Sequence, residues 1–249
     1  LPRRPGNKLI QVGWLLTDAW ASTTLRADPF IPAVLETDDL RLHYYDPTQT
    51  YLVPHVARSY HKSLEFQRYI FDWTPWEKTT VMLTDFSDYA NAAAGVVPNN
   101  AIQLDIAPLN RIFETFTASE RVYMMMNHEL VHVATMDGWN EQDRWWRRAF
   151  LGKPTPEQAH PESILYFYLA APRVVSPRWY TEGSATFMET WMAGGIGRAQ
   201  GAYDEMVFRS MVRDDAHFYS NLGLVSEGTL VDFQVGVNAY LYGTRFFSY

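Results

Sequence analysis

The segment Asn127–Thr135 reads NHELVHVAT, with His128 and His132 four positions apart and Glu129 directly after the first histidine. On an α-helix, four residues turn through about 400° and rise about 6 Å, so the two imidazoles lie on one side, one turn apart. That spacing lets both rings bind one metal ion and leaves Glu129 able to reach a water molecule beside it. A tetrahedral metal would need a third protein ligand from elsewhere in the chain.

The sequence around these histidines predicts a long helix with an apolar face. The helix is expected to start near Thr117 or Ser119, with Ser119 as its cap and Glu120 in its first turn, and to end near Gly138. Two histidines and a glutamate on a half-buried face would be costly without partners, and a metal ion would satisfy them. The alternative is an ordinary structural helix with incidental histidines.

A second motif lies downstream, where Pro177–Thr190 reads PRWYTEGSATFMET. HELVH followed by WYTEGSA resembles the gluzincin metallopeptidases, the relatives of thermolysin and aminopeptidase N, and most closely their bacterial peptidase-MA-like domains. The resemblance implies one Zn²⁺ ion held by His128, His132 and Glu182. It also implies that Glu129 is the general base of peptide-bond hydrolysis, with zinc activating the water.

Two further residues enter through the resemblance. Glu189 lies seven positions after Glu182, about 20° away around the helix, where the family often has a glutamate that supports a ligand histidine. The alternative for Glu189 is a solvated helix residue. The stretch YLYG that begins at Tyr240 resembles the family's Tyr-x-x-Gly, whose tyrosine hydrogen-bonds the oxyanion. Tyr242 or Tyr180 could serve instead, and Tyr240 could simply pack the last helix.

Periodicity predicts an α+β protein in which strands come first and helices later. The resemblance implies a zincin, thermolysin-like fold, with a small N-terminal mixed sheet, an active-site helix and a mostly helical C-terminal lobe. Strands are expected at 38–46, 79–86 and 101–106, with a small-residue loop at 87–100. Further helices are expected at 51–73, 140–152, 161–171, 181–195 and 198–213, and from about 231.

The strand before the zinc helix edges the substrate cleft in the family. By that resemblance Ala101, Ile102, Gln103 and Leu104 would pair with an extended peptide backbone by strand addition. The alternative is an inner strand without substrate contact. The stretch AAAGVVPNNAIQLDIAP lacks the acidic Gly-x-Met-Glu-Asn anchor of the aminopeptidases, which argues against aminopeptidase activity.

The bulk composition limits the possible partners. The net charge is -7 and no cluster of basic residues stands out, so nucleic acid is not an expected partner. No apolar run is long enough to span a bilayer. The chain has no cysteine, which excludes disulfides and thiolate chemistry.

Residues 1–37 are interpreted as an N-terminal arm. Arg3, Arg4 and Lys8 precede an apolar stretch that ends in Ala19-Trp20-Ala21, which resembles the remnant of an export signal and predicts a periplasmic or secreted bacterial protein. An irregular arm is the alternative. Residues 38–249 would form the metallopeptidase domain, with a sheet and zinc-helix lobe at 38–138 and a helical lobe at 139–249. The final helical pattern has no capping signal, which suggests a further C-terminal domain.

The sequence therefore supports the hypothesis of a zinc-dependent peptidase, more specifically an endopeptidase, that acts on peptides or proteins. The alternative is a catalytically idle zincin module that binds a peptide or a partner protein. Other chemistries fit less well: Ser184 is not in a nucleophile elbow, and the five other histidines lack ligand spacing.

Overall fold

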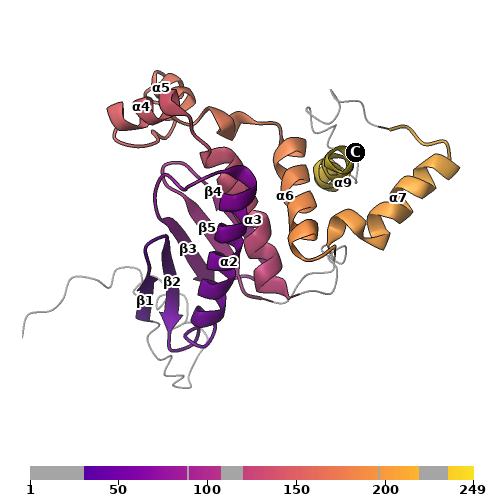
Figure 1. Cartoon of the computed structure of the whole chain (residues 1–249), viewed down its shortest axis with the longest axis horizontal. Coiled ribbons are helices and arrows are strands. Elements are labelled where there is room, and N and C mark those ends of the chain that lie inside the picture. Colours follow the sequence, from indigo (N-terminus) through magenta and orange to yellow (C-terminus); the bar gives the residue numbers. More distant parts are fainter. Residues whose placement is uncertain (1–30, 89, 108–119, 196, 219–234) are drawn as a thin grey trace, which may run out of the picture.

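The computed structural model describes residues 31–88, 90–107, 120–195, 197–218 and 235–249. They form a mixed five-stranded sheet with helices on one face, followed by a helical region (Figure 1). The strands are β1 Ile31–Glu36, β2 Leu40–Asp46, β3 Thr79–Thr84, β4 Asn91–Gly95 and β5 Ala101–Asp105. The helices are α2 Val53–Phe71, α3 Arg121–Asp137, α4 Glu141–Ala149, α5 Ser163–Ala170, α6 Arg178–Met192, α7 Ala202–Arg213 and α9 Val235–Ser248, with short 3₁₀ turns η2 Pro172–Val175 and η3 Arg198–Gln200.

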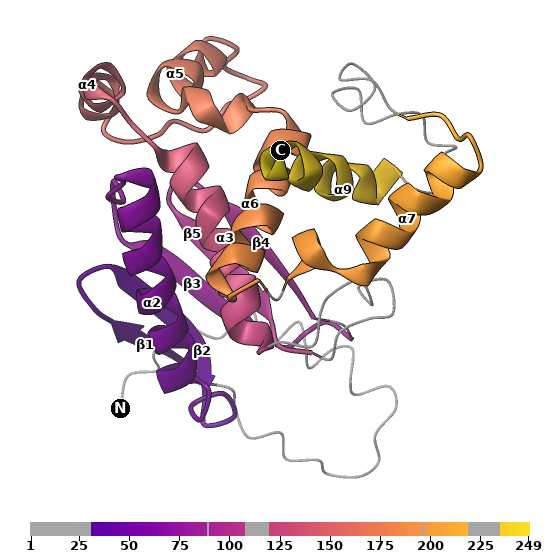
Figure 2. The same cartoon turned by 45° about the vertical axis from the view of Figure 1, so that its right-hand side comes forward.

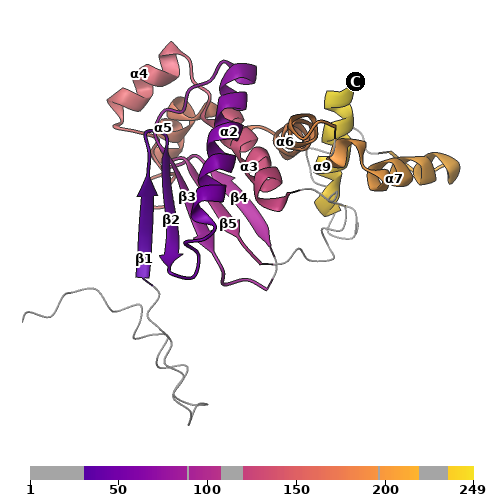
Figure 3. The same cartoon turned by 60° about the horizontal axis from the view of Figure 1, so that its bottom comes forward.

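The strand order in the sheet is β1-β2-β3-β5-β4. The three central strands run parallel, because α2 crosses over between β2 and β3, while β1 and β4 pair antiparallel at the two edges. Alternate residues of β2, β3 and β5 point at α2 and α3, which lie on one face of the sheet (Figure 3). This mixed α/β arrangement is compatible with the predicted α+β class, although the parallel crossover from β2 through α2 to β3 was not predicted.

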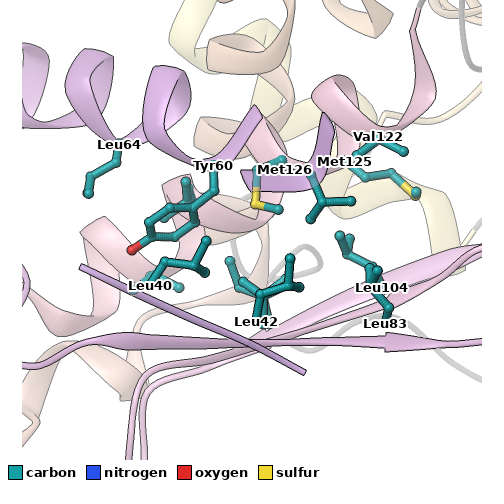
Figure 4. Packing of buried hydrophobic residues seen from close by; sticks show 14 of the residues in the cluster. Leu40, Leu42, Tyr60, Leu64, Leu83, Leu104, Val122, Met125 and Met126 are labelled. Carbon is teal, nitrogen blue, oxygen red and sulfur yellow. The ribbon is translucent and has the colours of Figure 1, made fainter. Parts of the chain in front are cut away.

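The core fills the space between that face and the two helices (Figure 4). Leu40, Leu42 and Leu104 on the strands are fully buried, and Tyr60 of α2 and Met126 of α3 cover them. Met126 belongs to this core. Its neighbours Met124 and Met125 are also buried, but they line a cavity described below.

Two strands lie where the sequence predicts none. Residues 31–36, assigned above to the N-terminal arm, form β1 and pair with β2 along its length. Residues 91–95, assigned to a loop, form β4. The β4 sequence NAAAG is rich in residues with low strand propensity, so only its pairing with β5 makes it a strand. The expected export signal lies outside the described residues.

The helix boundaries follow the sequence to within a few residues. The helix α3, which carries His128 and His132, begins at Arg121. The carboxylate of Glu120 caps it by accepting hydrogen bonds from the backbone N–H groups of Val122 and Tyr123. Glu120 is therefore the cap rather than a first-turn residue, and α3 ends before Gly138 as predicted. None of the described helices is both long and apolar enough to cross a bilayer.

A buried ion cluster fixes the C-terminal end of α3. The carboxylate of Asp137 accepts hydrogen bonds from Arg147 of α4 at 3.0 Å and from Lys153 at 2.9 Å. Its other oxygen accepts from the Asn100 side chain and the Trp76 backbone, each at 3.0 Å. Asp137 and Arg147 are fully buried, so every charge in the cluster depends on its partners. The cluster joins α3 to α4 and to the loop before β5.

We therefore expect Asp137→Asn to lower the free energy of unfolding by about 3–5 kcal/mol, because two cations lose their shared anion. Urea unfolding followed by circular dichroism measures this. The matched control is Asp214→Asn, which breaks a pair with Arg213 whose side chains are 58% and 77% exposed and should cost no more than about 0.5 kcal/mol. Equal losses for the two variants would contradict the structural role of the cluster.

Candidate metal centre

His128 and His132 lie in the middle of α3, and both side chains contact Glu182 of α6. Figure 2 shows α3 and α6 side by side. Their Nε2 atoms are 3.1 Å apart, and the two rings meet nearly edge-on at 83°. Both histidines are buried, with 7% and 8% of their surface exposed. The geometry is the one that the i, i+4 spacing predicts.

The third residue of the site, Glu182, belongs to α6. Glu182 Oε2 lies 3.3 Å from His128 Nε2 and 3.1 Å from His132 Nε2. Two ligands bound at about 2.0–2.1 Å to one tetrahedral ion are roughly 3.3–3.4 Å apart, so this triangle has the size that such an ion requires. Two imidazole nitrogens and a carboxylate facing one another also suit a cation. The structure thus brings together His128, His132 and Glu182, the three ligands that the resemblance implies, as a group that could hold a metal ion.

Glu189 lies two turns further along α6 and holds the opposite edge of His128. Its Oε2 atom lies 2.8 Å from His128 Nδ1, and only 1% of the residue is exposed. An Nδ1–H that donates to Glu189 leaves the Nε2 lone pair directed at the triangle. Glu189 therefore has the supporting position that the resemblance implies, and the alternative of a solvated residue is wrong.

Arg198 is a further residue of the site, and no sequence motif predicted it. Its Nε and Nη2 atoms donate to the two oxygens of Glu189 at 2.6 and 2.8 Å, and its guanidinium carbon lies 5.0 Å from the centre of the Tyr240 ring. The chain reaches this position through a tight reversal at Gly194 and Gly195, whose φ angles are 67° and 90°. The only signal in the sequence was this glycine-rich turn, and it carries no motif for an arginine.

The pKa values follow from burial and from this ring of charges. Burial lowers the pKa of His128, but its hydrogen bonds to Glu182 and Glu189 outweigh burial and raise that pKa to about 9. Burial raises the pKa of Glu182, yet the two histidines hold it well below its usual range. Burial likewise raises the pKa of Glu189, but Arg198 and His128 bring it down to about 2. Both carboxylates are therefore anionic at neutral pH.

Glu129 differs from the other two carboxylates. It follows His128 on α3 and is 6% exposed, and its burial raises its pKa although the neighbouring histidines oppose the shift. A carboxyl group whose pKa is raised toward neutrality is suited to accept and return a proton.

The positions of the three tyrosines that were candidates for the oxyanion donor distinguish them. Tyr240 of α9 stacks on His128, with ring centres 6.1 Å apart, and lines the cavity beside the histidine. Tyr242 points instead at Met211, with its hydroxyl 3.9 Å from the sulfur. Tyr180 is 39% exposed and packs against Phe247. Only Tyr240 of these three lines that cavity.

The cavity next to the triangle has a volume of about 60 Å³. One wall comes from α3 and the other side from the start of β4 and from the groups around Arg198. Its lining residues are Ala90, Asn91, Ala92, Met124, Met125, His128, Glu129, Glu189, Arg198 and Tyr240.

The predicted substrate strand requires a correction. β5 is hydrogen-bonded to β3 on one side and to β4 on the other, so Ala101, Ile102, Gln103 and Leu104 have no free backbone edge. Ile102 and Leu104 are fully buried in the core. The prediction that this strand pairs with a substrate is wrong, and the alternative of an inner strand is right. The edge strand on the side of the cavity is β4.

A pair of glycines brings α9 to the site. Gly183 follows Glu182, and Gly243 lies three residues after Tyr240, at the point where α6 and α9 cross. A Cβ atom on Gly183 would overlap the backbone of Gly243, and one on Gly243 would overlap the Trp179 carbonyl. The crossing is therefore possible only without side chains at both positions. This contact fixes Tyr240 next to His128.

No protein-family model matches the chain, and a search of the curated proteins finds no match. An inference about function therefore rests on the chemistry of this site.

We expect Glu189→Gln to weaken metal binding about 10- to 100-fold, because a neutral amide holds His128 Nδ1 less firmly than a carboxylate. Competition with a chromophoric chelator measures the affinity. The control is Glu205→Gln, an exposed glutamate that also pairs with arginines and lies outside the site. Unchanged affinity in a folded Glu189→Gln protein would mean that Glu189 does not orient the histidine.

We expect Gly243→Ala to lower the free energy of unfolding by about 1–3 kcal/mol, because α9 must move away from α6. In an unobstructed helix the same change stabilises by about 1 kcal/mol, so the sign alone is informative. Thermal unfolding measures it. Gly95→Ala is the control, since nothing lies within 4 Å of an added Cβ there. A stabilised Gly243→Ala protein would refute the close crossing.

Proposed function

We propose that the protein is a zinc-dependent hydrolase of peptide bonds with the gluzincin arrangement and a zincin fold. The observation that carries the proposal is the triangle of His128, His132 and Glu182, whose edges measure 3.1 to 3.3 Å, with the buried Glu129 beside it. Three protein ligands with space next to them are typical of catalytic zinc sites. The mixed sheet, with its antiparallel edge strand and the metal-binding helix on one face, is compatible with this fold.

In the proposed mechanism Glu129 transfers the proton, and His128, His132 and Glu182 hold the metal that would activate the water and the scissile carbonyl. Bound Zn²⁺ supplies a Lewis acid that polarises the scissile carbonyl and makes a water molecule acidic near neutral pH. Glu129 takes the proton from that water and delivers it to the leaving amine. Burial, which raises the pKa of Glu129, strengthens it as a base and lets it hold the proton between the two steps.

Tyr240 is the proposed donor to the oxyanion. Burial raises the pKa of its phenol to about 12, so the hydroxyl keeps its proton at neutral pH and can donate a hydrogen bond. The ring contacts both His128 and the guanidinium of Arg198, which limits its rotation. A donor fixed before the reaction stabilises developing charge without reorganisation.

The proposed substrate is an extended polypeptide that adds to the sheet along β4. This strand is the outermost one that the structure describes on this side of the sheet, and Ala90, Asn91 and Ala92 at its start line the cavity. An extended backbone would satisfy the free edge and lie across Glu129. Because the chain lacks the acidic anchor for an amino terminus, internal bonds are the expected targets.

The test compares the parent protein with Glu129→Gln and Tyr240→Phe. We expect about one zinc ion per chain in all three by elemental analysis. Cleavage of casein, an unstructured substrate, should fall at least about 100-fold in Glu129→Gln, which loses the base. Tyr240→Phe should lower kcat about 100-fold with little change in KM, because its hydrogen bond forms with the oxyanion.

Two outcomes would contradict the proposal. A parent protein that binds no metal while it is folded would remove its basis. A zinc-loaded parent that cleaves neither casein nor a peptide library would favour the alternative, a zincin module that binds peptides without hydrolysing them.

A further inference from the structure

The helix α5 is apolar along its whole length and yet mostly exposed. Its sequence, SILYFYLA, contains no charged side chain, and only its end residues Ser163 and Ala170 are buried. Ile164, Leu165 and Tyr168 are exposed by 58%, 57% and 54%. A helix that is apolar all round is normally buried, whereas the described part of the chain leaves most of this one uncovered.

The exposed surface continues from α5 onto α4. A chain of ring contacts joins the two helices: Trp145 to Trp146 at 4.5 Å, Trp146 to Phe150 at 5.2 Å, and Phe150 to Tyr166 at 5.0 Å. Both helices stand together at one end of the molecule, away from α7 (Figures 1 and 2). We call the exposed members the hairpin patch, which consists of Trp145, Leu151, Ile164, Leu165, Tyr166 and Tyr168.

The size of the hairpin patch calls for a specific partner. The six large side chains of the patch, which are exposed by 39% to 96%, offer on the order of 700 Å² of surface. A soluble monomer rarely shows a contiguous apolar patch above a few hundred Å². A standard protein interface buries roughly 800 Å² on each side. Leu151, which is 96% exposed, is the most accessible member.

We propose that the hairpin patch binds the same patch of a second copy of this chain, with α5 against α5 across a two-fold axis. A two-fold interface brings each surface against itself, so like charges would meet at its centre. α5 carries no charge at all and therefore avoids that repulsion. Cations and anions at its rim, such as Arg148 and Glu162, can pair across the axis.

The charges around the hairpin patch favour a second copy of the chain over an anionic membrane as the partner. Arg144 pairs with Glu141 at 3.3 Å, and Arg148, Glu157 and Glu162 are exposed on α4 and on the segment that leads to α5. A surface that binds anionic lipid carries an excess of lysine and arginine, and this one does not. None of the residues that line the cavity beside the histidines belongs to the hairpin patch, so the dimer leaves that cavity uncovered.

Light scattering coupled to gel filtration, from about 1 to 100 µM protein, tests the proposal. We expect the parent to approach twice the monomer mass of 28.8 kDa as concentration rises. The variant Ile164→Glu/Leu165→Glu places four like charges at the interface and should raise the dissociation constant about thirtyfold or more. Val212→Glu is the control, because Val212 on α7 is 70% exposed but lies outside the patch.

A second measurement uses the absence of cysteine from the chain. Single substitutions Ile164→Cys, Leu165→Cys and Tyr168→Cys should each be compared with Val212→Cys under mild oxidation. Residues near the two-fold axis come within disulfide distance, so at least one patch variant should give a cross-linked dimer at low micromolar concentration. Val212→Cys should not.

Three outcomes overturn the proposal. The first is a parent that stays monomeric throughout the concentration range. The second is a dimer that persists in Ile164→Glu/Leu165→Glu. The third is a monomeric parent whose hairpin patch binds phosphatidylcholine and phosphatidylglycerol vesicles or casein, which would assign the surface to a lipid or to an unfolded polypeptide. Failure of casein cleavage would leave the dimer unaffected, so this test is independent of the proposed activity.

Discussion

The metal centre depends on the contact between α3 and α6. Val131 of α3 packs against Ala185 and Met188 of α6, and Val131 and Ala185 are fully buried. This apolar contact sets the position of α6 along α3, and it brings Glu182 and Glu189 to the two nitrogens of the same imidazole. Seven residues along a helix rise about 10 Å and return to nearly the same face, so one rigid element can reach both edges of the ring.

The contact between α3 and α6 also determines how α9 packs against the site. Because α6 lies against α3, α9 can approach only over the other side of α6, where Gly183 and Gly243 allow the backbones to meet. The ring of Tyr240 then reaches His128, and Arg198 fills the space between the ring and Glu189. The metal ligands, the supporting carboxylate and the phenol are thus positioned by helices that bury one another, and not by flexible loops.

The sequence predicted the parts of this site that depend on local geometry. The i, i+4 spacing places His128 and His132, and the i, i+7 spacing relates Glu182 to Glu189, because both are properties of a single helix. The resemblance to the gluzincins joined the two helices. Arg198 could not be found in this way, since it reaches the site through a turn whose direction depends on tertiary packing. A lone arginine after a glycine-rich turn has no periodic signal.

The strands of the fold also divide into those that local sequence patterns predict and one that depends on tertiary contacts. β2, β3 and β5 alternate buried and exposed residues, and the pattern identifies them. β4 has no such pattern, because its residues are small, and it is a strand only through its hydrogen bonds to β5. The resemblance assigned the substrate to the strand before α3, and that prediction requires a free edge on β5. The unpredicted strand β4 occupies that edge.

The charges and donors of the centre indicate which ion it would bind. With both imidazoles neutral, as metal ligation requires, the three carboxylates of Glu129, Glu182 and Glu189 and the one guanidinium of Arg198 carry a formal charge of −2 when all four are ionised. A divalent cation neutralises that charge, whereas a monovalent ion leaves an uncompensated charge in a site of low dielectric. Two imidazole nitrogens and one carboxylate suit Zn²⁺ better than Ca²⁺ or Mg²⁺, which prefer shells of oxygen ligands. Structural zinc sites use four protein ligands, and the described residues offer three, so the donor set favours a catalytic ion over a structural one.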